Sequence, residues 1–156
     1  MTGIATPERV IDGETVKVEA DDNIALILDH GNAIFSVIQT GFVYGAQRED
    51  WTIQIIGIGG AMTMGSYDWD PKDVALYSGD PTKTSGEWSA IPQDKESYAW
   101  EGGATYIAEC LAQGKKPVLT GEHAVHVFEI MQSALQSSAS GQRVRIESTF
   151  PWPLIS

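Results

Sequence analysis

The sequence contains little of what several protein classes depend on. Cys110 is the single cysteine, which excludes an intrachain disulfide or a cysteine-based zinc site and fits a reducing, cytoplasmic compartment. Only 10 residues are Lys or Arg, against 21 Asp and Glu, so the formal net charge is −11. Such a chain repels phosphate groups, and we expect neither nucleic acid nor an anionic membrane surface as a partner. No apolar run approaches the roughly 20 residues that span a bilayer, and the first residues predict no signal peptide.

The composition that remains is that of an ordinary globular protein. Hydrophobic residues make up 42% of the 156 residues and charged residues 20%, which argues against disorder. Residues 1–100 hold 16 acidic and 6 basic side chains, whereas residues 101–156 hold 5 and 4. No repeat or linker-like tract separates these two parts. We therefore predict a single domain over residues 1–156.

Alternating polar and apolar residues predict strands in the first part of the chain. Residues 23–29 and 33–44 flank the turn-forming sequence His30-Gly31-Asn32, which indicates a hairpin. Shorter strands are expected at residues 15–19, 51–58, 61–64, 74–77 and 87–91.

Helical spacing appears only in the second part. Residues 103–113 predict a short helix and residues 121–140 a long one, with Thr120 as N-cap and Gly141 as its end. A last alternating strand is expected at residues 143–147. The long helix carries an apolar stripe formed by Ala124, Val127, Phe128, Met131 and Leu135. The fold class that follows is α+β: a mostly antiparallel sheet of about six strands, with helices on one face and an open second face.

An open sheet face predicts self-association. Strand 33–44 carries apolar side chains on both faces, and two helices can cover only one of them. The uncovered set would form an apolar patch of the kind that marks an interface. We expect a homodimer or a dimer of dimers built sheet to sheet. The candidate interface residues are Ile34, Val37, Ile38 and Phe42.

A glycine cluster at residues 57–62 invites comparison with the dinucleotide-binding fingerprint. That fingerprint requires a third glycine where Met62 stands, and a helix that presents its N-terminus to the pyrophosphate. A Thr-Met strand follows instead, so a tight turn between strands is the better interpretation. No P-loop motif occurs either.

Glu122, His126 and Glu129 share the face of the long helix opposite the apolar stripe, and His123 lies nearer the edge of that stripe. A metal site is conceivable, but the zinc-protease order is absent. We favour a hydrogen-bonded strip at a packing interface. Cys110 has neither a base nor a helix N-terminus nearby in sequence and reads as a small packed hydrophobe.

Two further patterns have ordinary explanations. The acids of residues 68–73 resemble a calcium loop, but Asp73 stands where that loop needs glycine, so a solvated turn before a strand is expected. Four tryptophans could line a sugar site, although any sheet uses such side chains to cover its face. They are Trp51, Trp69, Trp88 and Trp100.

Residues 117–131, which read PVLTGEHAVHVFEIM, and their continuation to Val144 resemble the C-terminal helix and strand of the Gfo/Idh/MocA family. This family comprises NAD(P)-dependent sugar and polyol dehydrogenases. The upstream order is similar too: residues 18–28, then 55–62, then the Trp-Asp-Pro of 69–71 ahead of 74–77. The resemblance covers nearly the whole chain and implies the sheet-bearing substrate and oligomerisation domain of such an enzyme.

The departures from that family define what we expect this chain to lack. This chain has no counterpart of the family's Rossmann domain, its Glu-Lys-Pro triplet or its second catalytic residue. Lys115-Lys116-Pro117 is not that triplet, because it stands directly before the last helix. We therefore expect no catalytic residue and no bound cofactor, although NAD or NADP is implied for the parent enzyme. A separate Rossmann-domain protein is a conceivable partner. Two other hypotheses stay open: a free-standing binding or scaffold protein derived from this domain, and an enzyme that uses its own cleft.

Overall fold

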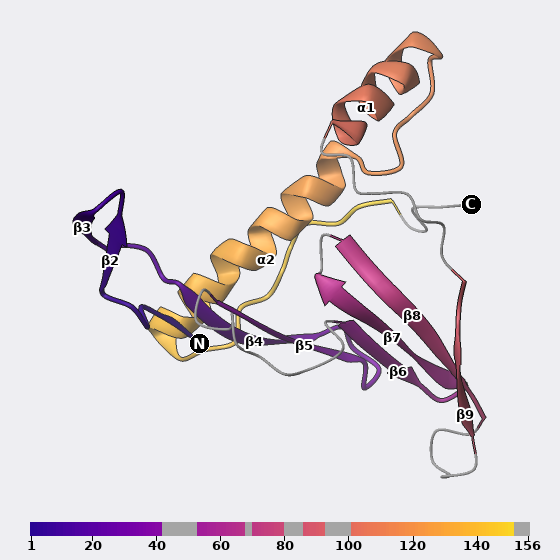
Figure 1. Ribbon diagram of the computed structural model, residues 1–156, viewed down its shortest axis with the longest axis horizontal. Coiled ribbons are helices and arrows are strands. Elements are labelled where there is room, and N and C mark those ends of the chain that lie inside the picture. Colours follow the sequence, from indigo (N-terminus) through magenta and orange to yellow (C-terminus); the bar gives the residue numbers. More distant parts are fainter. Residues whose placement is uncertain (42–52, 68–69, 80–85, 93–100, 152–156) are drawn as a thin grey trace. The chain divides into compact units, whose positions relative to one another are not determined.

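The computed structural model describes residues 1–41, 53–67, 70–79, 86–92 and 101–151. The chain divides into two compact units, one formed by Met1–Ala46 with Ala104–Ser156 and the other by Gln47–Gly103. The described residues form nine strands in three antiparallel sheets, and two helices (Figure 1). The α+β class with mostly antiparallel strands is thus confirmed, with the strands distributed over three sheets in place of a single one.

The first unit contains a three-stranded sheet in the order β1-β4-β5. Strand β4 (Asn23–Asp29) and strand β5 (Phe35–Gly41) form the predicted hairpin, in which Leu26 pairs with Ile38 and Ile27 with Val37. Strand β1 (Thr2–Gly3) pairs with the start of β4, on the side of β4 away from β5. With two residues, β1 is too short for its sequence pattern to predict it.

A separate two-stranded hairpin joins strand β2 (Glu8–Ile11) to strand β3 (Glu14–Lys17). Asp12 and Gly13 connect them with φ values of 51° and 85°. Two positive φ values over an Asp-Gly pair are the geometry of a tight hairpin turn that matches the strand twist. Strand β3 corresponds to the strand expected at residues 15–19, whereas β2 was not anticipated.

The second unit is a four-stranded meander in the order β6-β7-β8-β9. Its strands are β6 (Ile53–Gly57), β7 (Gly60–Tyr67), β8 (Asp70–Ser78) and β9 (Glu87–Ala90). All four were expected, but β8 begins four residues before the predicted start. The prediction of a solvated turn at residues 68–73 is wrong for Asp70 to Asp73, because Asp70 already pairs with Tyr67 of β7. Residues 68 and 69 lie outside the described residues.

Helix α1 (Gly102–Ala112) and helix α2 (Gly121–Ser140) lie where the spacing predicts them. The expected last strand is wrong: residues 143–147 pair with no strand of the described part of the chain. They still alternate between exposed and half-buried residues, as a strand does. A physical reason lies in α2, since the amides of Glu147 and Ser148 donate to the Glu129 carboxylate and leave no strand ladder there.

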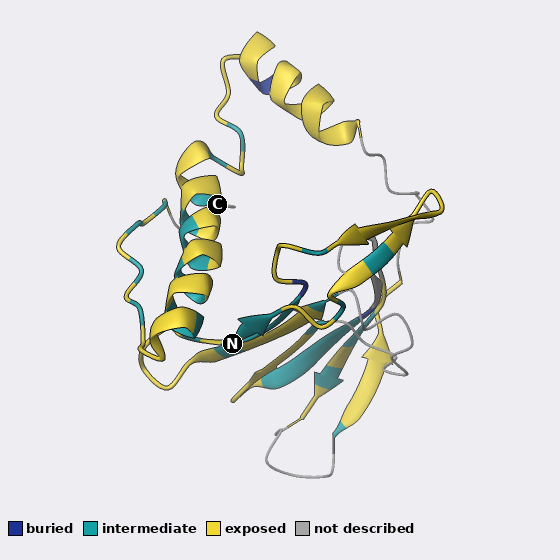
Figure 2. Cartoon of the chain, turned by 90° about the vertical axis from the view of Figure 1, so that its left-hand side faces the viewer, coloured by how far each residue is buried: buried dark blue, intermediate teal, exposed yellow. Residues whose placement is uncertain are grey.

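The orientation of α2 is the main departure from expectation. Its apolar stripe, including Val127, Phe128 and Met131, is exposed. The half-buried residues lie along one side of the helix and are mainly polar or small (Figure 2). They include His123, His126, Glu129, Ile130, Ser133, Ala134, Ser137 and Ser138.

Buried residues are few. Asp22, Gly65 and Cys110 are the ones found among the residues whose exposure is described. On the β4–β5 hairpin, Ile27 is 70% exposed and its cross-strand partner Val37 is 77% exposed. Because opposite residues of an antiparallel pair point to the same side, Ile27, Phe35 and Val37 lie on one uncovered apolar face.

Candidate functional site

Both ends of α2 are fixed by the residues that the sequence singles out. The Thr120 hydroxyl accepts a hydrogen bond from the His123 amide at 3.4 Å. At the other end Gly141 adopts a left-handed conformation with φ of 67°, and its N–H donates to the Ser137 carbonyl at 2.8 Å. These caps satisfy backbone groups that the helix leaves free. They fix where α2 begins and ends.

Glu129 is the centre of a contact between α2 and the chain that follows it. Its two carboxylate oxygens accept hydrogen bonds from the amides of Glu147 and Ser148, each at 2.8 Å. These bonds favour the ionised carboxylate. The Glu147 amide, followed by the hydroxyl and amide of Ser148, holds the Glu129 pKa below its usual value of 4.5.

His126 extends this contact by one helical turn. Its Nδ1 atom lies 3.0 Å from both the carbonyl oxygen and the hydroxyl oxygen of Ser148. The Phe150 ring packs against two imidazoles, with centroids 4.8 Å from His123 and 5.0 Å from His126. The expected hydrogen-bonded strip at a packing interface is confirmed for His126 and Glu129, since both contact the chain that follows α2.

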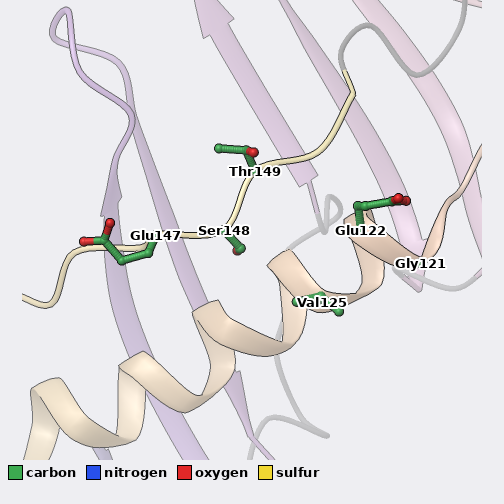
Figure 3. Close-up of a pocket in the computed structure, with 6 residues that line it drawn as sticks. All are labelled: Gly121, Glu122, Val125, Glu147, Ser148 and Thr149. Carbon is green, nitrogen blue, oxygen red and sulfur yellow. The ribbon is translucent and has the colours of Figure 1, made fainter.

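A shallow pocket of about 670 Å³ lies beside this contact. Its walls are the first turn of α2 and the extended segment from Glu147 to Thr149 (Figure 3). Glu122 lines it, with a pKa below the usual 4.5 because the Thr120 hydroxyl and the Glu122 amide favour its ionised form. Hydroxyls and carboxylates can bind a polar ligand here, but this pocket brings no base and nucleophile together.

A larger groove of about 840 Å³, which we call the edge groove, lies elsewhere in the first unit. Six consecutive residues of β4 and the turn after it, Ala25 to His30, form one wall. Residues 143–146 and one side of α2 form the others, and Val37 reaches in from β5. Arg143 contacts the Asp29 carboxylate across one end. This carboxyl has a lowered pKa, caused first by the Gly31 amide and then by Arg143.

The glycine cluster forms the tight turn that the sequence predicts. Ile58 and Gly59 connect β6 to β7, and Gly57 pairs with Gly60. A Cβ atom on Gly60 would lie 2.8 Å from the Tyr77 carbonyl oxygen, so glycine is needed for close strand approach. A turn between two strands presents no helix N-terminus to a pyrophosphate. These residues therefore do not fit NAD or NADP.

The remaining candidates take ordinary places. Cys110 is buried in α1, as expected of a packed hydrophobe. Within the described residues, no three His, Cys, Asp or Glu side chains gather as a metal site requires. Trp88 packs against Tyr77 with ring centroids 5.5 Å apart. Trp51, Trp69 and Trp100 lie outside the described residues.

The candidate interface residues lie in and before β5. Ile34 and Val37 are exposed, and Ile38, on the opposite face from Val37, is 39% exposed. Phe42 lies outside the described residues. The sequence indicated the apolar stripe of α2 but not its exposure, and it did not indicate the edge groove. Both depend on where the chain that follows α2 lies.

No family model, curated protein or solved structure matches this chain. Neither described helix has the length and apolar character needed to cross a membrane.

Proposed function

We propose that this chain is the substrate-wall and oligomerisation domain of an NAD(P)-dependent sugar or polyol oxidoreductase of the Gfo/Idh/MocA type. In this proposal it works in the cytoplasm and leaves nucleotide binding and hydride transfer to a Rossmann-domain partner. The observation that carries the assembly role is the uncovered apolar face of Ile27, Phe35 and Val37. The sequence resemblance alone supports the oxidoreductase role.

Two separate surfaces support assembly. The β4–β5 face exposes three large apolar side chains side by side, and α2 exposes Phe128 and Met131 along one stripe. Contiguous apolar surface is seldom left in water and usually marks an interface. A self-complementary face closes most simply into a two-fold dimer. A stable dimer of this kind needs above roughly 1,000 Å² of total buried surface.

Light scattering coupled to gel filtration tests the assembly role. We expect a mass of two or four chains at micromolar protein. Val37→Lys places a charge in the apolar face and is expected to give single chains. Thr40→Lys is the matched control, because Thr40 is exposed on the opposite face of the same strand and should leave the mass unchanged. A single-chain mass for the unaltered protein across a tenfold concentration range would rule out this role.

The oxidoreductase role needs its own test. A Rossmann-domain protein added in trans is expected to produce NAD- or NADP-dependent oxidation of a polyol that neither protein carries out alone. An in-frame Rossmann sequence upstream in the gene would give the same support. A genomic neighbourhood without any such protein, together with no activity in the mixture, would favour the free-standing binding protein instead.

A further inference from the structure

The edge groove lies beside an incomplete strand pair. Strand β1 pairs with β4 at Thr2 and Gly3, opposite Ile24 and Asn23. Met1 continues the same line, since its ammonium donates to the Ala25 carbonyl and its carbonyl accepts from the Ala25 amide, at 2.8 and 2.9 Å. Beyond Ala25 no strand of the described residues pairs with β4 on this side.

The backbone direction of β4 follows from that double hydrogen bond. In an antiparallel pair, a residue whose backbone N–H and C=O both bond to the neighbouring strand alternates with one whose N–H and C=O face the opposite edge. The N–H and C=O of Ala25 face β1, so those of Ile27 and Asp29 face the same edge of β4. Leu26 and Leu28 point toward β5, with which they pair. The residues from Ala25 to Asp29 all line the edge groove.

The opposite wall is also an open backbone edge. Residues 143–146 are extended, and their side chains alternate between exposed and half-buried. Their backbone makes no hydrogen bond to another backbone group within the described ranges, which end at residue 151. Both segments line the edge groove, whose volume is about 840 Å³. A strand that pairs with β4 would lie about 4.8 Å from it.

We propose that the edge groove binds one extended polypeptide strand, which adds to the free edge of β4 antiparallel to it and continues the line of β1. A strand in this position satisfies the backbone of Ile27 and Asp29, a recurrent mode of peptide recognition. The inference goes beyond the proposed function, although Ile27 and Val37 belong both to the apolar face of the assembly role and to the edge groove.

The side chains of the groove define the chemistry of that strand. Its residues lie opposite Leu26, Ile27, Leu28 and Asp29 in turn, counting away from Met1. The first three positions take apolar β-forming side chains, because the facing residues are apolar. The fourth takes a small polar one. The strand needs no lysine or arginine, since Arg143 already pairs with Asp29 and Arg145 with Glu147.

A strand joined directly to Met1 tests the proposal on the full chain. The extension reads threonine, valine, isoleucine, valine, with the last valine preceding Met1, so that the isoleucine lies opposite Ile27. In the matched control, proline replaces that isoleucine and removes the N–H that would donate to Ile27. The readout is amide hydrogen exchange by NMR at Ile27 and Asp29. Leu26 and Leu28, already paired with β5, report that the sheet is intact.

The proposal expects at least tenfold slower exchange at Ile27 and Asp29 with the extension, and loss of most of this slowing with proline. Unchanged exchange at both residues, while Leu26 and Leu28 stay protected, would overturn it. If the Ile27 amide of the unextended chain exchanges more slowly as the protein concentration rises tenfold, the groove would instead be assigned to a second copy of the chain.

A more polar extension, threonine-valine-threonine-valine, keeps the experiment possible if the first one precipitates. The chain mass measured by light scattering is a separate result, so failure of the strand proposal and failure of the assembly role are distinguishable.

Discussion

Arg9 Nη2 lies 2.7 Å from Oδ2 of Asp22, and this ion pair ties strand β2 to the chain just before β4. The same carboxylate accepts hydrogen bonds from the amides of Ala5 at 2.6 Å and Thr6 at 3.3 Å. The side chain of Asp22 is 3% exposed. A buried carboxylate is stable only with such partners, so Asp22 organises the first 22 residues more than any apolar side chain there does.

Asp22→Asn should therefore destabilise the first unit. The amide keeps one acceptor oxygen but loses the charge that pairs with Arg9, and it turns a donor toward one of the backbone amides. Thermal unfolding at neutral pH is expected to show a lower Tm than for the unaltered chain. Asp12→Asn, at an exposed turn position, serves as control and should leave the Tm within error. Equal Tm values for the two variants would contradict the role of Asp22.

The same carboxylate predicts a pH dependence. The Ala5 amide, with Arg9 and Thr6, lowers the Asp22 pKa below the usual 3.8. A lowered folded-state pKa contributes stability above the unfolded-state value, and that contribution is lost as pH falls through the folded-state pKa. The Tm difference between the unaltered chain and Asp22→Asn is thus expected at neutral pH and should shrink below about pH 4. A difference that is constant down to strong acid would contradict ionisation as its cause.

Glu129→Ala should free the segment after α2. It removes the acceptor of the Glu147 and Ser148 amides, and bonds to a charged acceptor are stronger than neutral ones. We expect the exchange of these two amides to rise roughly tenfold, with α2 itself unaffected. Glu122→Ala is the matched control on the same side of the helix. Acid should have the same effect as Glu129→Ala, since the Glu129 pKa lies below 4.5 and its protonation removes the charge.

Gly60→Ala should destabilise the β6–β9 sheet, whereas Gly59→Ala should not. A Cβ on Gly60 meets the Tyr77 carbonyl at 2.8 Å, while one on Gly59 has nothing within 4 Å. Overpacking of this kind costs about 1–3 kcal/mol. Chemical denaturation of both variants measures the difference. Similar free energies of unfolding for the two would mean that the strands are not in such close contact.

Isothermal titration with NAD and with NADP at millimolar concentration should give no binding heat. Residues 57–60 form a strand–turn–strand connection, which cannot present a helix N-terminus to the pyrophosphate. Saturable binding with a micromolar dissociation constant would contradict this.

The elements that the sequence predicts well are those with strong local signals. Thr120 and Gly141 predict the first and last residues of α2 correctly, and the His30-Gly31-Asn32 turn predicts the β4–β5 hairpin. Strand β1 has only two residues, and the Glu-Arg-Val-Ile sequence of β2 does not alternate between polar and apolar residues, so neither gives a strand signal.

The candidate site was only partly predictable. The spacing of Glu122, His126 and Glu129 indicates a shared polar face, but not which backbone it binds, because its partners lie 18 to 22 residues further along the chain. The apolar stripe of α2 suggested that this side of the helix would be buried, whereas it is exposed. An amphipathic pattern predicts two different faces, and tertiary contacts decide which of them turns inward.

The scarcity of buried residues has a calorimetric consequence. The heat capacity of unfolding comes mainly from apolar surface that water newly reaches, about 12–15 cal/mol/K per residue in ordinary domains. Here the described residues that are buried are Asp22, Gly65 and Cys110, and large side chains such as Val37 and Phe128 are already hydrated. The single chain should therefore unfold with a small heat-capacity increment and a shallow denaturant slope. Association that covers these side chains would raise both toward ordinary values.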